Sequence, residues 1–237
     1  MIEDILAQAG LVPDIDDDQL GQAYESCPAV HKSVVKNAVS FAYALAQTGS
    51  EPLSLTRMLG HVEESVSVRR LDWAFFCVDL IRFPVTAICA AMTQALAARV
   101  ETVVVHVTGP LPDVFLFGCD LLSVDQIFTG PVGAVLDVLA ANGQGVVIDL
   151  AGLNPDFAHV VRPDPAGYGV RVELPDSEFV QAYHAVTALV QPQARPYISY
   201  GGDPGSVPVV MAGHLLGCWV WDVITPATFR RTTATYS

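Results

Sequence analysis

Two histidines in the later part of the chain are the side chains best suited to proton transfer. They are His184 and His214, and an imidazole that titrates near neutral pH can both accept and return a proton. Neither has a second histidine or a carboxylate at the spacing of metal ligands. We therefore predict His184 and His214 as the catalytic residues of any reaction, with His214 as the general base, and we expect no bound metal.

The other histidines have simpler interpretations. Three of them lie in polar or mixed segments and are typical of a protein surface: His31, His61 and His159. His106 instead interrupts the apolar run from Val103 to Val107, which favours a hydrogen-bonded imidazole in the core.

A first candidate binding loop surrounds Asp79 and Thr86. Asp79 comes at the end of an apolar run, and Thr86 opens the helical segment that follows. Free N–H groups at such a helix start, at the carboxyl edge of a sheet, are a common place for an anionic cofactor. The alternative is that Pro84 is an ordinary first-turn proline and Thr86 an ordinary helix cap.

A second loop of the same kind contains Gly130 and Gly133. If it lies on a strand next to the first loop, the two can close on one ligand, although Gly133 can equally serve to bring its helix close to the sheet. Asp149, at the end of a later apolar run, can bind a ribose hydroxyl or cap the residues beyond it. The usual glycine-rich phosphate loops, G-x-G-x-x-G and G-x-x-x-x-G-K-[ST], are absent from the sequence.

The elements that must position these residues alternate between two patterns from Leu71 to Leu150. Short apolar runs predict strands at Phe75–Ile81, Thr102–Val107, Asp125–Phe128 and Val146–Leu150. Segments of helical period lie between them, at Thr86–Val100, Leu111–Leu122 and Val132–Ala141. Such alternation predicts an α/β fold, a three-layer open parallel sheet of Rossmann type.

The flanking segments are less regular. Residues 1–70 form a predicted N-terminal helical segment, with helices at Gln19–Cys27, Lys32–Gln47 and Ser54–Val66. Residues 71–237 form the α/β domain, including a tail that returns to the sheet. In that tail we predict strands at Gly169–Leu174 and Tyr197–Tyr200 and a helix at Ser177–Val190, after a loop at Asn154–Gly169.

Composition limits the partners. With 12 basic and 25 acidic residues, a formal net charge of -13, the chain repels nucleic acid and anionic lipid surfaces. The acidic run from Asp14 to Asp18 is typical of a solvated helix start. Five widely spaced cysteines without a C-x-x-C pair indicate buried thiols in a reducing compartment. Because Met1–Ala9 contains no signal peptide, we predict a cytoplasmic protein. As partners we predict a small-molecule ligand and a second copy of the chain in a homodimer.

Three segments occur in an order that resembles the histidinol dehydrogenase family, which is related to the aldehyde dehydrogenase fold. They are F-P-V-T at Phe83–Thr86, AMTQALAARVETVVV at Ala91–Val105 and LLSVDQIFTGPVGAVLDVL at Leu121–Leu139. Gly213–Leu216 and Phe229–Thr233 are similar to the family's N-H-x-L-P and F-x-x-R-T-S segments. The resemblance implies a Rossmann-like nucleotide-binding domain and, for an oxidoreductase-like reaction, NAD or NADP as cofactor.

The sequence also departs from that family. Val78–Arg82 replaces its glycine-rich P-G-G segment, and Asp149–Gly152 replaces its G-P-G-N segment. The family's Glu-His acid–base pair has no counterpart around His184, and Val209 or Val210 stands where a zinc-binding aspartate is expected. We therefore predict a protein that binds a nucleotide or related anion without zinc-dependent histidinol oxidation. The alternative is a non-catalytic interaction or regulatory module that uses the helix face Val34–Leu45 or Trp219 and Trp221.

Overall fold

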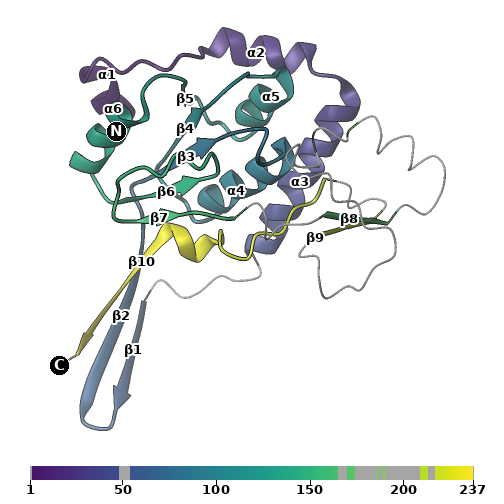
Figure 1. The fold of residues 1–237 in the computed structure, drawn as a ribbon. Helices are drawn as coiled ribbons and strands as arrows, with labels where there is room; N and C mark the ends of the chain where they lie inside the picture. Colours follow the sequence, from purple (N-terminus) through teal and green to yellow (C-terminus); the bar gives the residue numbers. More distant parts are fainter. Residues whose placement is uncertain are drawn as a thin grey trace.

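A parallel sheet of five strands forms the centre of the molecule (Figure 1). The structure, a computed structural model, describes residues 2–47, 54–164, 170–173, 186, 189, 209–212 and 217–236. The sheet has the order β5-β4-β3-β6-β7. Its strands are β3 (Trp73–Val78), β4 (Thr102–Val107), β5 (Gln126–Phe128), β6 (Gly145–Asp149) and β7 (Val160–Val161). The predicted α/β fold with an open parallel sheet is therefore confirmed.

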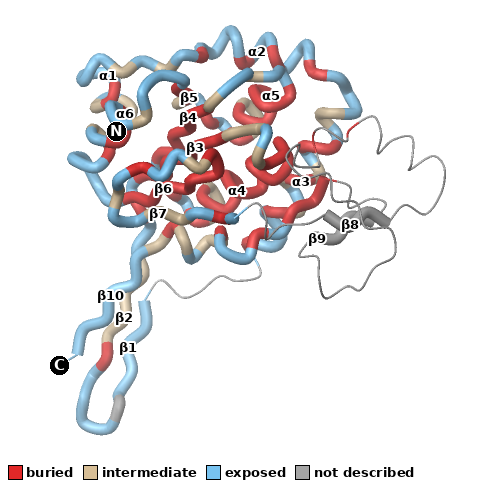
Figure 2. The backbone as a smooth tube through the Cα atoms, viewed as in Figure 1, coloured by how far each residue is buried: buried red, intermediate tan, exposed pale blue. Residues whose placement is uncertain are grey.

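Helices cover both faces of this sheet. The helices that follow strands are α4 (Val85–Ala97), α5 (Asp113–Leu121) and α6 (Val132–Ala141). Side chains of α4 and α5 belong to the larger core on one face, and those of α6 to a smaller core on the other. Every residue of β3, β4 and β6 is buried, which Figure 2 shows as the red centre of the molecule. Burial on both faces explains why these strands are continuous apolar runs.

The N-terminal helices lie outside both cores: α2 (Asp17–Ser26) and α3 (Ala29–Gln47) pack on the larger core and α1 (Ile2–Gln8) on the smaller one, beside α6. The predicted helices near 19–27 and 32–47 are therefore confirmed. Asp16 begins α2 with a reciprocal capping box to Gln19, as the acidic run predicted. Helix α3 packs along α4, where Nε2 of Gln94 donates to the carbonyl of Ala42 at 3.2 Å. No helix of the described ranges is both long and apolar enough to cross a membrane.

A three-stranded antiparallel arm extends away from the sheet (Figure 1). It consists of β1 (Ser54–Leu59), β2 (Val62–Arg70) and β10 (Arg230–Tyr236), in the order β1-β2-β10. The predicted helix at Ser54–Val66 is therefore wrong. Gly60, with φ +68°, and the next residue form a two-residue turn that fits a type II′ hairpin, and the C-terminal strand then pairs with β2.

Element boundaries differ from the predictions in smaller ways. Strand β3 ends at Val78, three residues before the predicted Ile81, because Asp79 begins a turn. The two-residue strand β7 lies inside the segment predicted as a loop. In the tail, β8 (Val170–Glu173) confirms a predicted strand and pairs in parallel with β9 (Val209–Ala212). Most of the predicted helix at 177–190 and the strand at 197–200 lie outside the described residues.

All five cysteines are free and buried. Burial raises the pKa of the Cys77 and Cys89 thiols to about 12 and that of Cys218 to about 11, because a buried thiolate is poorly solvated. The cysteines therefore act as small core side chains rather than nucleophiles, as their sequence pattern predicted.

Candidate ligand-binding edge of the sheet

Three helices begin just beyond the carboxyl ends of the central strands. The residues at their N-caps are all prolines without a side-chain hydrogen bond to the helix: Pro84 before α4, Pro112 before α5 and Pro131 before α6. Proline suits a helix start because it lacks an N–H group. The cap residues therefore leave the first-turn N–H groups of these helices to other partners.

Arg82 is the side chain at this edge whose hydrogen-bonding capacity is least used. Its Nε atom is buried and has no hydrogen-bond partner, and Arg82 forms no ion pair with any described residue. The guanidinium group lies directly on Gly152, so that a Cβ atom at Gly152 would lie 2.8 Å from Cζ of Arg82. Gly152 also has φ +75°, which favours glycine. The loop after β6 thus leaves space for a cation from the loop after β3.

The position of Arg82 at the edge of the sheet also favours ligand binding. From β3 the chain continues outward through β4 to β5, and it then crosses back to place β6 on the other side of β3. Open α/β sheets bind ligands in the crevice where the strand order reverses in this way. Arg82 and Gly152 come from the two loops that flank this crevice. A partly desolvated guanidinium that has no counter-ion among the described residues favours an anion at this place.

A hollow of about 380 Å³ lies on the other side of the same loop. It is lined by residues of the loops after β3 and β4: Asp79, Leu80, Ile81, Thr108, Pro110, Leu111 and Pro112. Oδ1 of Asp79 accepts the N–H of Ile81 at 2.8 Å and so fixes the turn, a local role for this predicted binding residue. The hollow provides space beside the crevice for the uncharged part of a ligand.

Thr86 lies under the returning tail rather than at an open edge. It is fully buried, and its Oγ1 donates to the carbonyl of Leu189 at 2.8 Å. A Cβ atom at Gly217 would lie 3.3 Å from Cγ2 of Thr86. The hydroxyl of Thr86 is therefore already used within the chain, and its predicted role in cofactor binding stays a prediction for the backbone alone.

Asp149 fixes the loop that follows β6. The residue is 2% exposed. Its Oδ1 accepts the N–H groups of Gly152 and Leu153 at 2.7 and 3.0 Å, and its Oδ2 accepts that of Asn154 at 2.9 Å. Of the two roles left open for this carboxylate, the geometry matches a cap, and it holds Gly152 in the position that Arg82 requires.

The second predicted loop does not meet the first. Gly130 follows β5, and β4 lies between β5 and β3, so the expectation of neighbouring strands is wrong. A Cβ atom at Gly133 would have no other atom within 4 Å, so close helix packing does not explain this glycine. His106 is a core imidazole as predicted, and its Nε2 donates to the carbonyl of Gly130 at 2.7 Å.

The carboxylate of Asp14 occupies the second loop. Its Oδ2 accepts the N–H and the hydroxyl of Thr129 at 2.6 and 2.9 Å. The hydrogen bonds from the backbone and hydroxyl of Thr129 lower the pKa of Asp14. The loop before α6 therefore binds a carboxylate of the chain itself.

We expect Asp14→Asn to destabilise the fold by about 1 kcal/mol at pH 7, since exposed charged hydrogen bonds are of that order. The folded pKa of Asp14 lies below its unfolded value of about 4. The stabilisation is therefore complete above the unfolded pKa and is lost as the pH falls through the folded pKa. Urea unfolding of both proteins at pH 7 and pH 3 checks this, and a difference that is equal at both pH values would contradict it.

The two predicted catalytic histidines, His184 and His214, lie outside the described residues, and their roles stay predictions. Within the described part of the chain, no three side chains of histidine, cysteine, aspartate or glutamate gather as a metal site would require. The geometry at hand therefore supports binding, through Arg82 and the loops around it.

The comparisons with known proteins concern the fold. No family model matches the chain, and no curated protein matches its sequence. The chain is similar in structure to histidinol dehydrogenase from Elizabethkingia anophelis, with a TM-score of 0.56 and 8% identity over 99% of this chain and 79% of that one. A cysteine-to-alanine mutant of propionaldehyde dehydrogenase from Clostridium phytofermentans gives a TM-score of 0.28 and 12% identity over 89% and 56% of the two chains. The first likeness confirms the expected distant resemblance at the level of the fold.

Proposed function

We propose that the protein binds a small anion, a nucleotide or a related phosphorylated or carboxylated compound, at the carboxyl edge of its sheet. The observation that carries this proposal is Arg82, which lies at the reversal of strand order without a counter-ion among the described residues. Its planar fork of N–H donors matches the oxygens of phosphate and carboxylate groups. The remainder of the ligand extends toward the hollow between the loops after β3 and β4.

Residues of the chain itself cover part of this edge and limit the size of the ligand. Leu189 and Gly217 lie over Thr86 at the start of α4, where the pyrophosphate of a dinucleotide binds in Rossmann folds. The loop after β3 also lacks the glycines that let a backbone approach a pyrophosphate. These residues fit NAD or NADP poorly, so the proposal is for a mononucleotide or smaller anion. Zinc-dependent histidinol oxidation is not part of it, because the sequence lacks the family's ligands.

Thermal-shift measurements with Arg82→Gln test this proposal. A ligand at a hundred times its dissociation constant adds about 2.7 kcal/mol of stability, so a panel of mononucleotides, NAD, NADP and small phosphates will identify binders. We expect Arg82→Gln to weaken binding about tenfold or more, because a charged hydrogen bond to an anion is lost. Arg57→Gln, which removes the same charge from the distant arm, serves as the control. No shift from any compound, or equal shifts in both variants, would contradict the proposal.

The arm supports a second candidate function, an interaction module that assembles as a homodimer. The surfaces expected for contacts are used internally, since Val34, Val35, Trp219 and Trp221 are buried within the chain. The arm instead exposes apolar side chains of β1 and β2: Leu55, Met58 and Val62. An extended ribbon with exposed edges and apolar side chains favours pairing with another chain.

We expect the double variant Leu55→Glu/Met58→Glu to shift the protein from dimer to monomer in sedimentation velocity. Tyr43→Glu changes an exposed ring on α3 and serves as the control, which is expected to remain dimeric. A monomeric unmodified protein at micromolar concentration would exclude this candidate without affecting the binding proposal.

A further inference from the structure

Four arginines lie at the root of the arm, where it joins the sheet, as two pairs on opposite faces of the ribbon. In the antiparallel pairing of β2 with β10, Arg69 lies opposite Arg231 and Arg70 lies opposite Arg230. Residues directly opposite each other have Cβ atoms about 5 Å apart, and like charges in such pairs destabilise the ribbon. The root of the arm therefore concentrates positive charge at a cost in stability, although the chain as a whole carries a net charge of -13.

Within the described part of the chain, these arginines have no acidic partner to offset that cost. The ion pairs within the described ranges join Arg57 to Glu64 and Arg162 to Asp149, and none involves the four at the root of the arm. Arg231 donates to the neutral side-chain oxygen of Gln144 at 2.6 Å, and Arg70 donates to the carbonyl of Arg99 at 3.5 Å. The guanidinium groups thus retain most of their capacity to bind an external anion.

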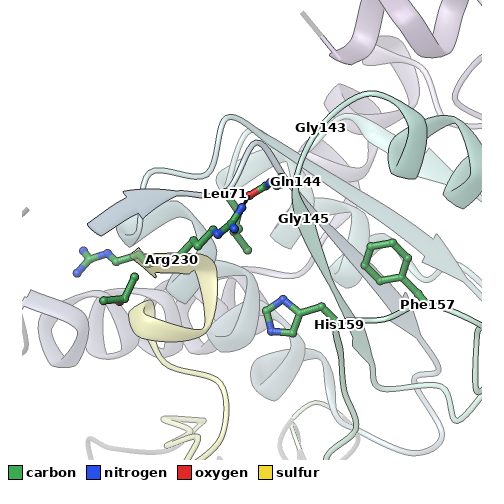
Figure 3. Close-up of a pocket in the computed structure, with 9 residues that line it drawn as sticks. Leu71, Gly143, Gln144, Gly145, Phe157, His159 and Arg230 are labelled. Atoms are coloured by element: carbon green, nitrogen blue, oxygen red, sulfur yellow. Dashed lines mark hydrogen bonds between the residues drawn. The ribbon is translucent and has the colours of Figure 1, made fainter. Parts of the chain in front are cut away.

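A hollow of about 490 Å³ lies beside this cluster, at the amino ends of β3 and β6 (Figure 3). Arg230, Arg231 and His159 supply its cationic or titratable side chains, and Phe157 and Leu71 supply apolar surface. Its volume is in the range of small-molecule sites. In Figure 3 His159 and Phe157 lie on one side of the hollow, and the side chain of Arg230 extends away from them on the other side.

Few groups near the hollow oppose an anion. Backbone of Gly143–Gly145 forms one wall. The carboxylate of Asp72 lies next to Gly143, where its Oδ2 accepts the N–H of Gln144 at 2.7 Å. Among the described residues, one engaged carboxylate lies near four arginines that form no ion pair, so the local charge is positive.

We propose that this hollow is a second anion site, which binds a phosphorylated small molecule. The fork of Arg231, which lies beside Gln144, holds the phosphate oxygens, because a guanidinium group binds phosphate with two parallel hydrogen bonds. Arg230 adds positive charge from the opposite face of the ribbon. Phe157 and Leu71 contact the apolar part of the ligand. The site is separate from Arg82, because Leu71 precedes β3 and Gly145 begins β6, whereas Arg82 follows the carboxyl end of β3.

Calorimetric titration with inorganic pyrophosphate at low salt tests the charged half of this site. We expect binding that weakens at least tenfold in Arg230→Gln/Arg231→Gln and also weakens with added salt. Lys36→Gln/Arg57→Gln removes two positive charges elsewhere and should retain the affinity. The first variant should also melt at a higher temperature than the unmodified protein, since like-charge repulsion is relieved, so a failure to fold is not the expected outcome.

Further measurements distinguish this site from the carboxyl edge of the sheet, and some of their outcomes would exclude it. No pyrophosphate binding to the unmodified protein, or an equal loss in both double variants, would overturn the proposal. Arg82→Gln should leave pyrophosphate binding to this site unchanged. Loss of all pyrophosphate binding in Arg82→Gln would assign the anion to the carboxyl edge of the sheet and would also overturn the proposal. A phosphorylated aromatic compound such as AMP should bind more tightly than pyrophosphate, and the difference should disappear in Phe157→Ala.

Discussion

Replacement of Gly145 by alanine is expected to destabilise the protein by about 3 kcal/mol or more, the largest effect among small substitutions in the sheet. A Cβ atom at Gly145 would overlap the ring of Trp73, which is fully buried in β3. The two residues are direct partners in the parallel pairing of β3 with β6. Neither strand can retreat, because each also pairs with a further strand.

Urea unfolding of Gly145→Ala measures this effect. Trp73→Leu in the same background removes the ring that the new methyl group meets, so a double-mutant cycle should show a coupling above 1 kcal/mol. Gly133→Ala is the matched control, because its Cβ atom would enter open space on a helix and alanine there should stabilise by about 0.5 to 1 kcal/mol. Equal effects of the two substitutions would contradict the packing of β3 against β6.

Asp149→Asn is expected to cost about 2 to 4 kcal/mol, the second large effect. The carboxylate accepts three backbone N–H groups in a buried position. An asparagine side chain retains only one acceptor oxygen and turns an NH₂ group toward N–H donors that it cannot satisfy. The loop that carries Gly152 should then lose its fixed position, and anion binding through Arg82 should weaken as well.

Thermal unfolding and hydrogen exchange of residues 150–154 check this result. Asp137→Asn, which changes an exposed carboxylate on helix α6, should be close to neutral. A stable Asp149→Asn variant with unchanged exchange in this loop would show that the carboxylate serves something other than the loop.

The central sheet could be predicted because its strands are buried on both faces. Thr102–Val107 coincides with β4 and Val132–Ala141 with α6, since a continuous apolar run and a helical period have few alternative solutions there. The ends of the strands were predicted less accurately, as at Asp79, whose side chain accepts a hydrogen bond from Ile81 and turns the chain within an apolar run.

The arm was missed because its apolar residues repeat at helical spacing. Val62 and Val66 are four residues apart, as on one helix face, but the alternation around Val66 and Val68 also fits a strand. Gly60 was the available signal, since a glycine between two such runs favours a two-residue hairpin. The third strand, β10, comes from the far end of the chain, and a local pattern contains no information about such a pairing.

The candidate site likewise depends on contacts between residues that are far apart in the sequence. Asp79 and Asp149 were placed correctly at strand ends, but their carboxylates bind nearby backbone. Arg82 is not among the candidate residues predicted from the sequence, because its importance depends on Gly152 across the sheet. Likewise, nothing in the sequence around Asp14 indicates that its carboxylate reaches Thr129.

Amide chemical-shift mapping tests the central claim most directly, namely that an anion binds between the loops that follow β3 and β6. The protein is titrated with the mononucleotide that gives the largest thermal shift, and backbone amide signals are followed residue by residue. We expect the largest changes in amide chemical shift at Asp79–Phe83, Thr108–Leu111 and Gly152, and we expect these changes to disappear in Arg82→Gln. Changes confined to other parts of the molecule, or the same pattern in Arg82→Gln, would contradict it.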